Sequence, residues 1–154
     1  MITVSTVAEL DPLVGTQLGT SSWVTLSAAD IAAFAELTGD RHWLHTDRQR
    51  AQADAPFGDV IAHGFLVLSL VTGLANECYG IGSAERWVNY GLERVRFTAP
   101  LLPDTPVRLR LALRDLQRLD SSPARLTLAC TVEKEDGSAV MVADWIVLVV
   151  EGEA

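Results

Sequence analysis

An apolar segment at residues 62–76, AHGFLVLSLVTGLAN, constrains the fold of this chain more than any other feature. As a helix it is hydrophobic on nearly every side, relieved by the small residues Gly64, Ser69 and Gly73. It is too short and too interrupted by polar residues to cross a bilayer of about 30 Å. A soluble chain has to cover such a helix with its other elements, so we expect residues 62–76 at the centre of the fold.

The pattern changes after this segment from helical to alternating, as strands require. Four strands are expected, at residues 91–101, 105–119, 124–137 and 139–151, and their short connections indicate an antiparallel meander. In the second of them Val107, Leu109 and Leu111 alternate with polar or small residues, which gives the sheet one dry face. A further strand is expected at residues 22–26.

Two shorter helices precede the apolar segment. One follows Ser27, a suitable N-cap, and ends at Gly39; the other spans residues 47–54. Helices first and strands afterwards predict an α+β fold, in which the sheet curls around residues 62–76. The length of 154 residues and the 49% of hydrophobic residues suit one domain over residues 1–154.

Charge and composition narrow the function and the location. The 12 Lys and Arg residues against 20 Asp and Glu residues give a formal charge of −8, the wrong sign for binding nucleic acid. Cys78 and Cys130 show no paired spacing, and the first residues lack the features of a signal peptide. We therefore expect a cytoplasmic protein that binds neither nucleic acid nor membrane.

Four groups that act as acids, bases or ligands fall within the segment TGDRHWLHTD: Asp40, His42, His45 and Asp47. Because the segment follows the helix stop at Gly39, its backbone is expected to be irregular and to point Asp40 and His45 into one cavity. A carboxylate and a neutral imidazole that face the same cavity can hold a water between them and move its protons.

A glycine that follows in IAHGF completes the candidate site. Gly64 is expected in the first turn of the apolar helix, where free N–H groups accumulate and a ligand can approach the backbone closely. A carbonyl oxygen on that N–H would be polarised toward an oxyanion. The proton-handling pair with an oxyanion donor indicates hydration or dehydration.

These histidines allow two other interpretations. A metal site at His42, His45 and Asp47 is the rival to the water-binding pair, but their spacing matches no common ligand signature, so no metal is expected. His63 directly precedes Gly64, and a histidine in such a place is more often packed and bonded to backbone than catalytic.

Three separated runs carry a family resemblance: FAELTGDRHWLHTD, FGDVIAHGFLVLSL and RVRFTAPLLPDTPVRL. In this order and spacing they resemble the MaoC-like dehydratases, the family of R-specific enoyl-CoA hydratases with a hot-dog fold. The resemblance spans residues 20–115. His42-Trp43 stands where most members have Asn-Pro, which is similar to the subgroup that includes nodulation protein N.

The resemblance assigns roles to particular residues. It implies that Asp40 and His45 are the catalytic pair and that the Gly64 N–H is the oxyanion donor. Thr72 matches a position where the family often has a serine near the catalytic water, and Trp43 is large enough to line the acyl pocket. We therefore expect Trp43, Thr72 and the histidine before Gly64, His63, to bind substrate.

The expected reaction is reversible hydration of a trans-2-enoyl thioester to the R-3-hydroxyacyl thioester. The resemblance implies the stereochemistry, a coenzyme A thioester and a homodimer, and no cofactor is consumed because water is the second substrate. Dimerisation would also cover the exposed edge of a curled sheet.

The same residues allow three alternative functions. A dehydratase of a carrier-bound hydroxyacyl group in polyketide or other secondary metabolism needs the same chemistry in reverse and stays open, as does a noncatalytic subunit that binds acyl thioesters. A hot-dog thioesterase is disfavoured because residues 60–76 contain no Asp or Glu.

Overall fold

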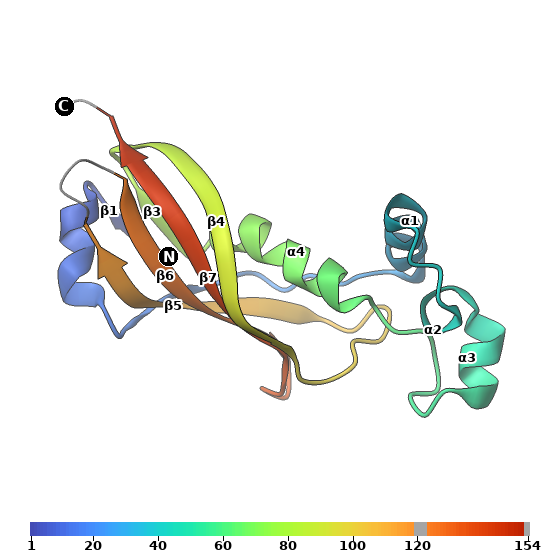
Figure 1. Ribbon diagram of the computed structural model, residues 1–154. Helices are drawn as coiled ribbons and strands as arrows, with labels where there is room; N and C mark the ends of the chain where they lie inside the picture. Colours follow the sequence, from blue (N-terminus) through green and yellow to red (C-terminus); the bar gives the residue numbers. More distant parts are fainter. Residues whose placement is uncertain (119–122, 153–154) are drawn as a thin grey trace.

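The computed structural model describes residues 1–118 and 123–152, and it has the α+β architecture expected from the sequence (Figure 1). A five-stranded antiparallel sheet runs in the order β2-β5-β6-β7-β4, and a separate parallel pair joins β1 to β3. The elements are, in chain order, β1 (Ile2–Val4), the 3-10 helix η1 (Val7–Leu13), β2 (Gln17–Thr20), α1 (Ala28–Thr38), α2 (Trp43–Thr46), α3 (Arg48–Asp54), α4 (Gly64–Ala75), β3 (Tyr79–Ile81), β4 (Ala84–Phe97), β5 (Val107–Gln117), β6 (Ala124–Lys134) and β7 (Ala139–Glu151).

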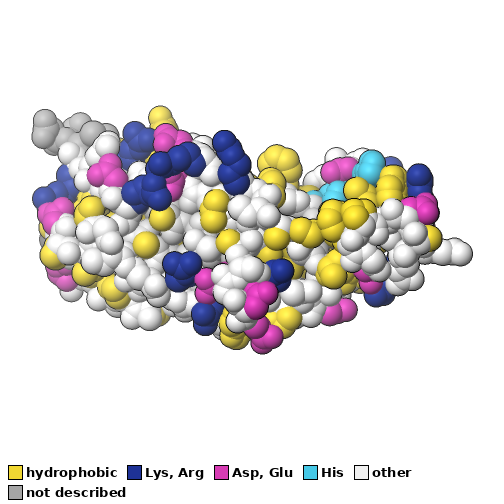
Figure 2. All heavy atoms as spheres, turned by 90° about the horizontal axis from the view of Figure 1, so that it is seen from below, with side chains coloured by type: hydrophobic (Ala, Val, Ile, Leu, Met, Phe, Trp, Pro, Cys, Tyr) yellow, Lys and Arg dark blue, Asp and Glu magenta, His cyan; other side chains and the backbone are white. Residues whose placement is uncertain are grey.

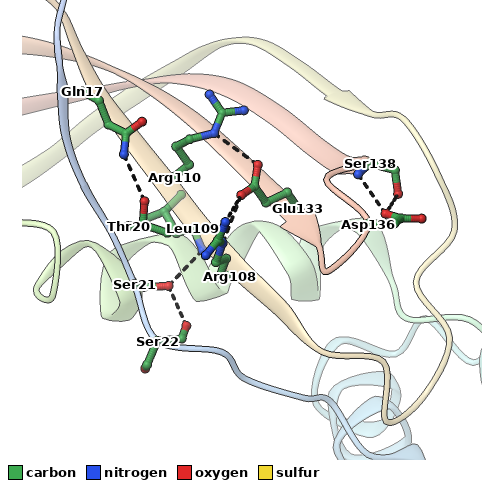
Figure 3. Close-up of polar contacts among 10 residues, drawn as sticks. All are labelled: Gln17, Thr20, Ser21, Ser22, Arg108, Leu109, Arg110, Glu133, Asp136 and Ser138. Carbon is green, nitrogen blue, oxygen red and sulfur yellow. Dashed lines mark hydrogen bonds and ion pairs between the residues drawn. The ribbon is translucent and has the colours of Figure 1, made fainter.

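The sheet has the predicted dry and wet faces. On β5, Val107, Leu109 and Leu111 are fully buried in the core that α4 shares. On the opposite face, Arg108 and Arg110 both donate to the carboxylate of Glu133 on β6, at 3.0 and 3.1 Å (Figure 3). The alternation in the sequence therefore predicted which side of the strand packs against the helix.

The simple meander holds for β5, β6 and β7 but is wrong for β4. This strand begins at Ala84, ends at Phe97 and pairs with β7, so it lies at the opposite edge of the sheet from the β5–β2 pair. Residues 98–106, which include three prolines, cross between them instead of forming a tight turn. Residue 119, the expected end of the second strand, lies outside the described residues.

The strand expected at residues 22–26 is also wrong. Only Val24 bridges to β5, and the regular strand is β2, further upstream. Regular pairing is interrupted at Ser22, whose N–H donates to the carboxylate of Glu77 at 2.7 Å. The preceding Ser21 hydroxyl accepts from the Leu109 N–H of β5 (Figure 3), and Val24 exchanges backbone hydrogen bonds with Val107.

Helices α1, α2 and α3 lie together beyond the end of the sheet, and we call this part of the chain the overhang. A connecting segment leads from it into α4 (Figure 1). The predicted limits of α1 are confirmed: Ser27 and Asp30 make a reciprocal capping box, and Gly39 ends the helix with a φ of 78°. Helix α3 begins one residue later than expected because Asp47 is its N-cap. The one-turn helix α2 was not predicted.

The sequence predicted that α4 would be covered on all sides. The structure corrects this, because α4 packs against the sheet on one side and is open on others. Val67, Val71 and Leu74 lie in the core, whereas Phe65 is 70% exposed and Thr72 is exposed as well. The sheet of one chain reaches only one side of the helix. Within residues 1–118 and 123–152, none of the helices has the length and apolar character needed to span a membrane.

Candidate active site

The three histidines lie at the end of the molecule where the overhang joins α4. Figure 2 shows exposed histidine side chains at this end, beside exposed hydrophobic side chains. Asp40 lies in the loop after α1, His45 belongs to α2, and His63 is the N-cap residue of α4. The sequence expectation that an irregular bend brings Asp40 toward His45 is met, although His45 itself sits in a short helical turn.

Asp40, His45 and His63 converge closely. One carboxylate oxygen and one nitrogen of each imidazole lie within 4.8 Å of one another. Two atoms that each hydrogen-bond the same water at about 2.8 Å are about 4.6 Å apart if the water is tetrahedral. The cluster is therefore of the right size for one water held between the carboxylate and an imidazole.

Backbone carbonyls fix the tautomer of both rings. The Nδ1 of His45 lies 2.7 Å from the carbonyl oxygen of Ile61, and the Nε2 of His63 lies 2.9 Å from that of Asp40. A carbonyl only accepts, so each of these nitrogens carries the proton. The second nitrogen of each neutral ring is then a bare lone pair, which on His45 is Nε2.

The surroundings keep His45 neutral near pH 7. Burial lowers the pKa of His45 below its usual range, and the neighbouring imidazole of His63 acts in the same direction. The hydrogen bond to Ile61 and the charge of Asp40 oppose the shift without cancelling it. A neutral imidazole with a bare Nε2 is the form that can take a proton from water.

The geometry favours proton transfer over metal binding at this cluster. The rings of His45 and His63 stack with centroids 3.7 Å apart and an angle of 25° between their planes. Lone pairs in two nearly parallel ring planes do not point at one ion, which would have to lie about 2.0–2.1 Å from each nitrogen.

His42 and Asp47, which with His45 made up the alternative metal site, have other hydrogen-bond partners. His42 is exposed and its Nδ1 accepts a hydrogen bond from the Leu44 N–H, while Asp47 accepts one from the Arg50 N–H as the cap of α3. Both side chains are explained by capping.

Gly64 is the first residue of α4, so its N–H belongs to the turn that has no partners inside the helix. It borders a cleft of about 310 Å³. The cleft is lined by His45, Phe57, Ile61, Ala62, Gly64, Val67, Phe97, Thr98, Ala99, Pro100, Leu101 and Val140. The candidate base and the candidate oxyanion donor therefore face the same space.

The packing of Phe97 is a second feature that requires glycine at position 64. A Cβ built on Gly64 would lie 2.6 Å from the Phe97 Cδ2 atom, far inside van der Waals contact. The sequence predicted glycine here for the approach of a ligand, and the packing of Phe97 on the backbone was missed.

Two of the expected substrate-binding residues lie elsewhere. Trp43 packs under the guanidinium of Arg50, 4.3 Å from the ring centroid, and does not line the cleft. Thr72 is two turns further along α4 and lines two other clefts with Asn89 and Trp145. The structure thus groups Asp40, His45 and His63 near Gly64, whereas Trp43 and Thr72 are not among the residues that line this cleft.

Sequence reasoning also missed the Ile61 carbonyl. A backbone oxygen leaves no mark in residue type, and only its position 16 residues after His45 in a folded loop brings it to the ring. Phe97 did lie within a run that carried the resemblance, and its aromatic side chain was the available signal.

Comparisons with known proteins agree with this architecture. The family model described as "MaoC like domain" matches residues 9–133. The 3-hydroxyacyl-thioester dehydratase Z of Mycobacterium tuberculosis is 40% identical over 139 residues, which cover 90% of this chain and 91% of that protein. Nodulation protein N of Rhizobium meliloti is 36% identical over 143 residues, covering 92% and 89%.

A solved structure shows the same fold. The MaoC-like dehydratase from Rhodospirillum rubrum superposes with a TM-score of 0.80 at 21% sequence identity, covering 97% of this chain and 99% of that one. The curved sheet packed on a central helix is therefore the hot-dog fold that the resemblance implied.

Proposed function

The chain belongs to the MaoC-like domain family, and from this premise we propose that it is a hydro-lyase that adds water reversibly across a trans-2-enoyl thioester to give the R-3-hydroxyacyl thioester. The observation that carries the proposal is the convergence of Asp40 and His45 within the span of one water, beside the start of α4. A relative named as a dehydratase of 3-hydroxyacyl thioesters supports the same reaction class.

In the proposed reaction the water lies between the Asp40 carboxylate and the bare Nε2 of His45. Its oxygen attacks Cβ of the enoyl group while this pair removes one of its protons, and the pair returns a proton to Cα on the same face. The Ile61 carbonyl keeps the Nδ1 proton of His45 away from the water, so the reactive nitrogen stays free. The net change is the addition of H and OH across the double bond.

Negative charge builds on the thioester oxygen as the water attacks. The Gly64 N–H, at the positive end of the α4 dipole, is the proposed donor to that oxygen. No redox or group-transfer cofactor is consumed, because the carbonyl already activates the double bond.

We further propose that a second copy of the chain covers the exposed sides of α4 and β4. Strand β4 is the last in the sheet order, and a long hydrophobic edge strand is a site of pairing. Its exposed large side chains, with Phe65 of α4, are Trp87, Val88, Tyr90, Leu92 and Phe97. A homodimer would bury this surface, and light scattering after size exclusion would give twice the 16.7 kDa chain mass.

The test of the reaction uses crotonyl-CoA, a longer enoyl-CoA and the corresponding enoyl carrier protein as substrates. Loss of the enoyl-thioester absorbance, with an R-3-hydroxyacyl product on chiral chromatography, supports the proposal. An S product would contradict the stereochemistry. Unchanged absorbance with all three substrates would overturn the enzymatic proposal in favour of a noncatalytic thioester-binding subunit.

The same assay shows whether the preferred substrate is bound to coenzyme A or to a carrier protein. A higher kcat/KM on the carrier protein than on either coenzyme A thioester would assign the carrier-bound reaction, and the reverse order would assign coenzyme A.

A further inference from the structure

We propose that His63 is a positioning residue, which holds Asp40 and His45 at the separation that one water requires. This inference rests on the proposed function, because it concerns the same pair. It differs from the expectation that His63 binds substrate: the ring acts through the two proton-handling residues and is only 3% exposed.

His63 is tied to Asp40 through the backbone. Its Nε2–H donates to the Asp40 carbonyl oxygen at 2.9 Å, across 23 residues of chain. Asp40 follows the left-handed Gly39, where the helical hydrogen-bond ladder has ended, and among the described residues its own N–H makes a long contact of 3.4 Å to the Thr38 hydroxyl. The bond from His63 therefore fixes the loop that carries Asp40 to the start of α4.

His63 is tied to His45 through its ring. The two imidazoles stack at 3.7 Å, and the ring of Phe34 on α1 packs on His63 with centroids 5.1 Å apart. One side chain at the N-cap of α4 thus contacts α1, the loop after it and α2. Asp40 lies in the loop before α2 and His45 within α2. The Thr46 hydroxyl of α2 also donates to the Arg41 carbonyl oxygen of that loop, and the His63 side chain contacts both Asp40 and His45.

The contacts explain why a histidine suits this position. The stack needs a flat ring, and the Asp40 carbonyl needs an N–H donor. The other ring nitrogen, the buried Nδ1 of His63, has no hydrogen-bond partner among residues 1–118 and 123–152. Leaving a buried acceptor unpaired costs free energy, which a purely structural role would not require.

The test separates the two contacts with two variants. His63→Gln keeps an amide donor and removes the ring, whereas His63→Phe keeps the ring and removes the donor. Each is expected to lower kcat on crotonyl-CoA on the order of 10²-fold, the usual effect of misplacing a reacting group by about 1 Å. KM is expected to stay within about 3-fold, because neither contact is with the substrate.

A matched control separates positioning from stability. Leu74→Ala opens a cavity in the core on the same helix, away from the cleft, so it should lower the melting temperature while leaving kcat unchanged where the protein is folded. If the His63 variants keep the wild-type kcat, or lose activity only in proportion to lost folded protein as Leu74→Ala does, the inference is wrong.

An NMR titration gives a readout that does not depend on turnover. The titratable groups that face His45 are His63, Asp40 and His42. Removing the His63 ring should displace the His45 ring resonances, because the stack is lost, and should raise the pKa of His45. Unchanged resonances and pKa in both variants would overturn the inference. A wild type inactive on every thioester would instead count against the proposed function, and the titration would still decide the role of His63.

Discussion

Gly64→Ala is the substitution whose effect the packing predicts most sharply. The new Cβ would lie 2.6 Å from Cδ2 and 2.8 Å from Cγ of Phe97. Carbon atoms in contact normally lie about 3.5–4.0 Å apart, so the ring or the start of α4 must retreat by about 1 Å. Overpacking of this size costs about 1–3 kcal/mol, whereas alanine in place of glycine in a helix would gain up to about 1 kcal/mol.

The net expectation for Gly64→Ala is a loss of about 1–2 kcal/mol in the free energy of unfolding. The assay is urea unfolding of four proteins: wild type, Gly64→Ala, Phe97→Ala and the double variant. If the Phe97 ring causes the loss, Gly64→Ala should cost less than about 0.5 kcal/mol once Phe97 is alanine, which gives a coupling energy of about 1 kcal/mol. Equal costs in both backgrounds, or a stabilising Gly64→Ala in the wild type, would refute the reasoning.

Four further outcomes are expected. Ser27→Ala removes the cap of α1 and should lower the free energy of unfolding by about 1 kcal/mol, measured by urea unfolding; an unchanged value would contradict the cap. Because burial lowers the pKa of His45, hydration should stay constant as pH falls to 6.5 and decline only below it; a decline centred above 6.5 would count against His45 as the base. Dialysis against EDTA should leave the rate unchanged, and a loss restored by metal would revive the metal alternative. Burial raises the pKa of Cys78 to about 11 and of Cys130 to about 12, so a thiol reagent should react with neither at pH 8 until the protein unfolds.

The features predicted from sequence are those that depend on local physics. Ser27 and Gly39 mark the limits of α1 because capping and a left-handed residue act within one turn of the chain. The buried face of β5 follows from strict alternation. The approach of Asp40 to His45 was foreseen because both flank one bend.

Non-local pairings were not predictable in the same way. Nothing in the composition of β4 indicates that it pairs with β7 at one edge of the sheet and not with β5. Both arrangements would bury similar residues. The exposed side of α4 was not predicted. An apolar pattern indicates that a helix face is buried, but it does not distinguish burial within one chain from burial against a second chain. From the sequence, His63 was expected to be a packed histidine that binds substrate, and its simultaneous contacts with Asp40 and His45, on which the proposed positioning role rests, could not be predicted.

The central claim is that the Asp40 carboxylate and the His45 imidazole handle the protons of one water. The most direct measurement is the rate of crotonyl-CoA hydration by Asp40→Asn and His45→Gln, beside Asp54→Asn, which makes the same chemical change on the exposed end of α3. Each variant of the pair is predicted to lose about 10²–10⁴-fold in kcat while Asp54→Asn keeps the wild-type rate. A folded Asp40→Asn or His45→Gln enzyme that retained most of its rate would contradict the account.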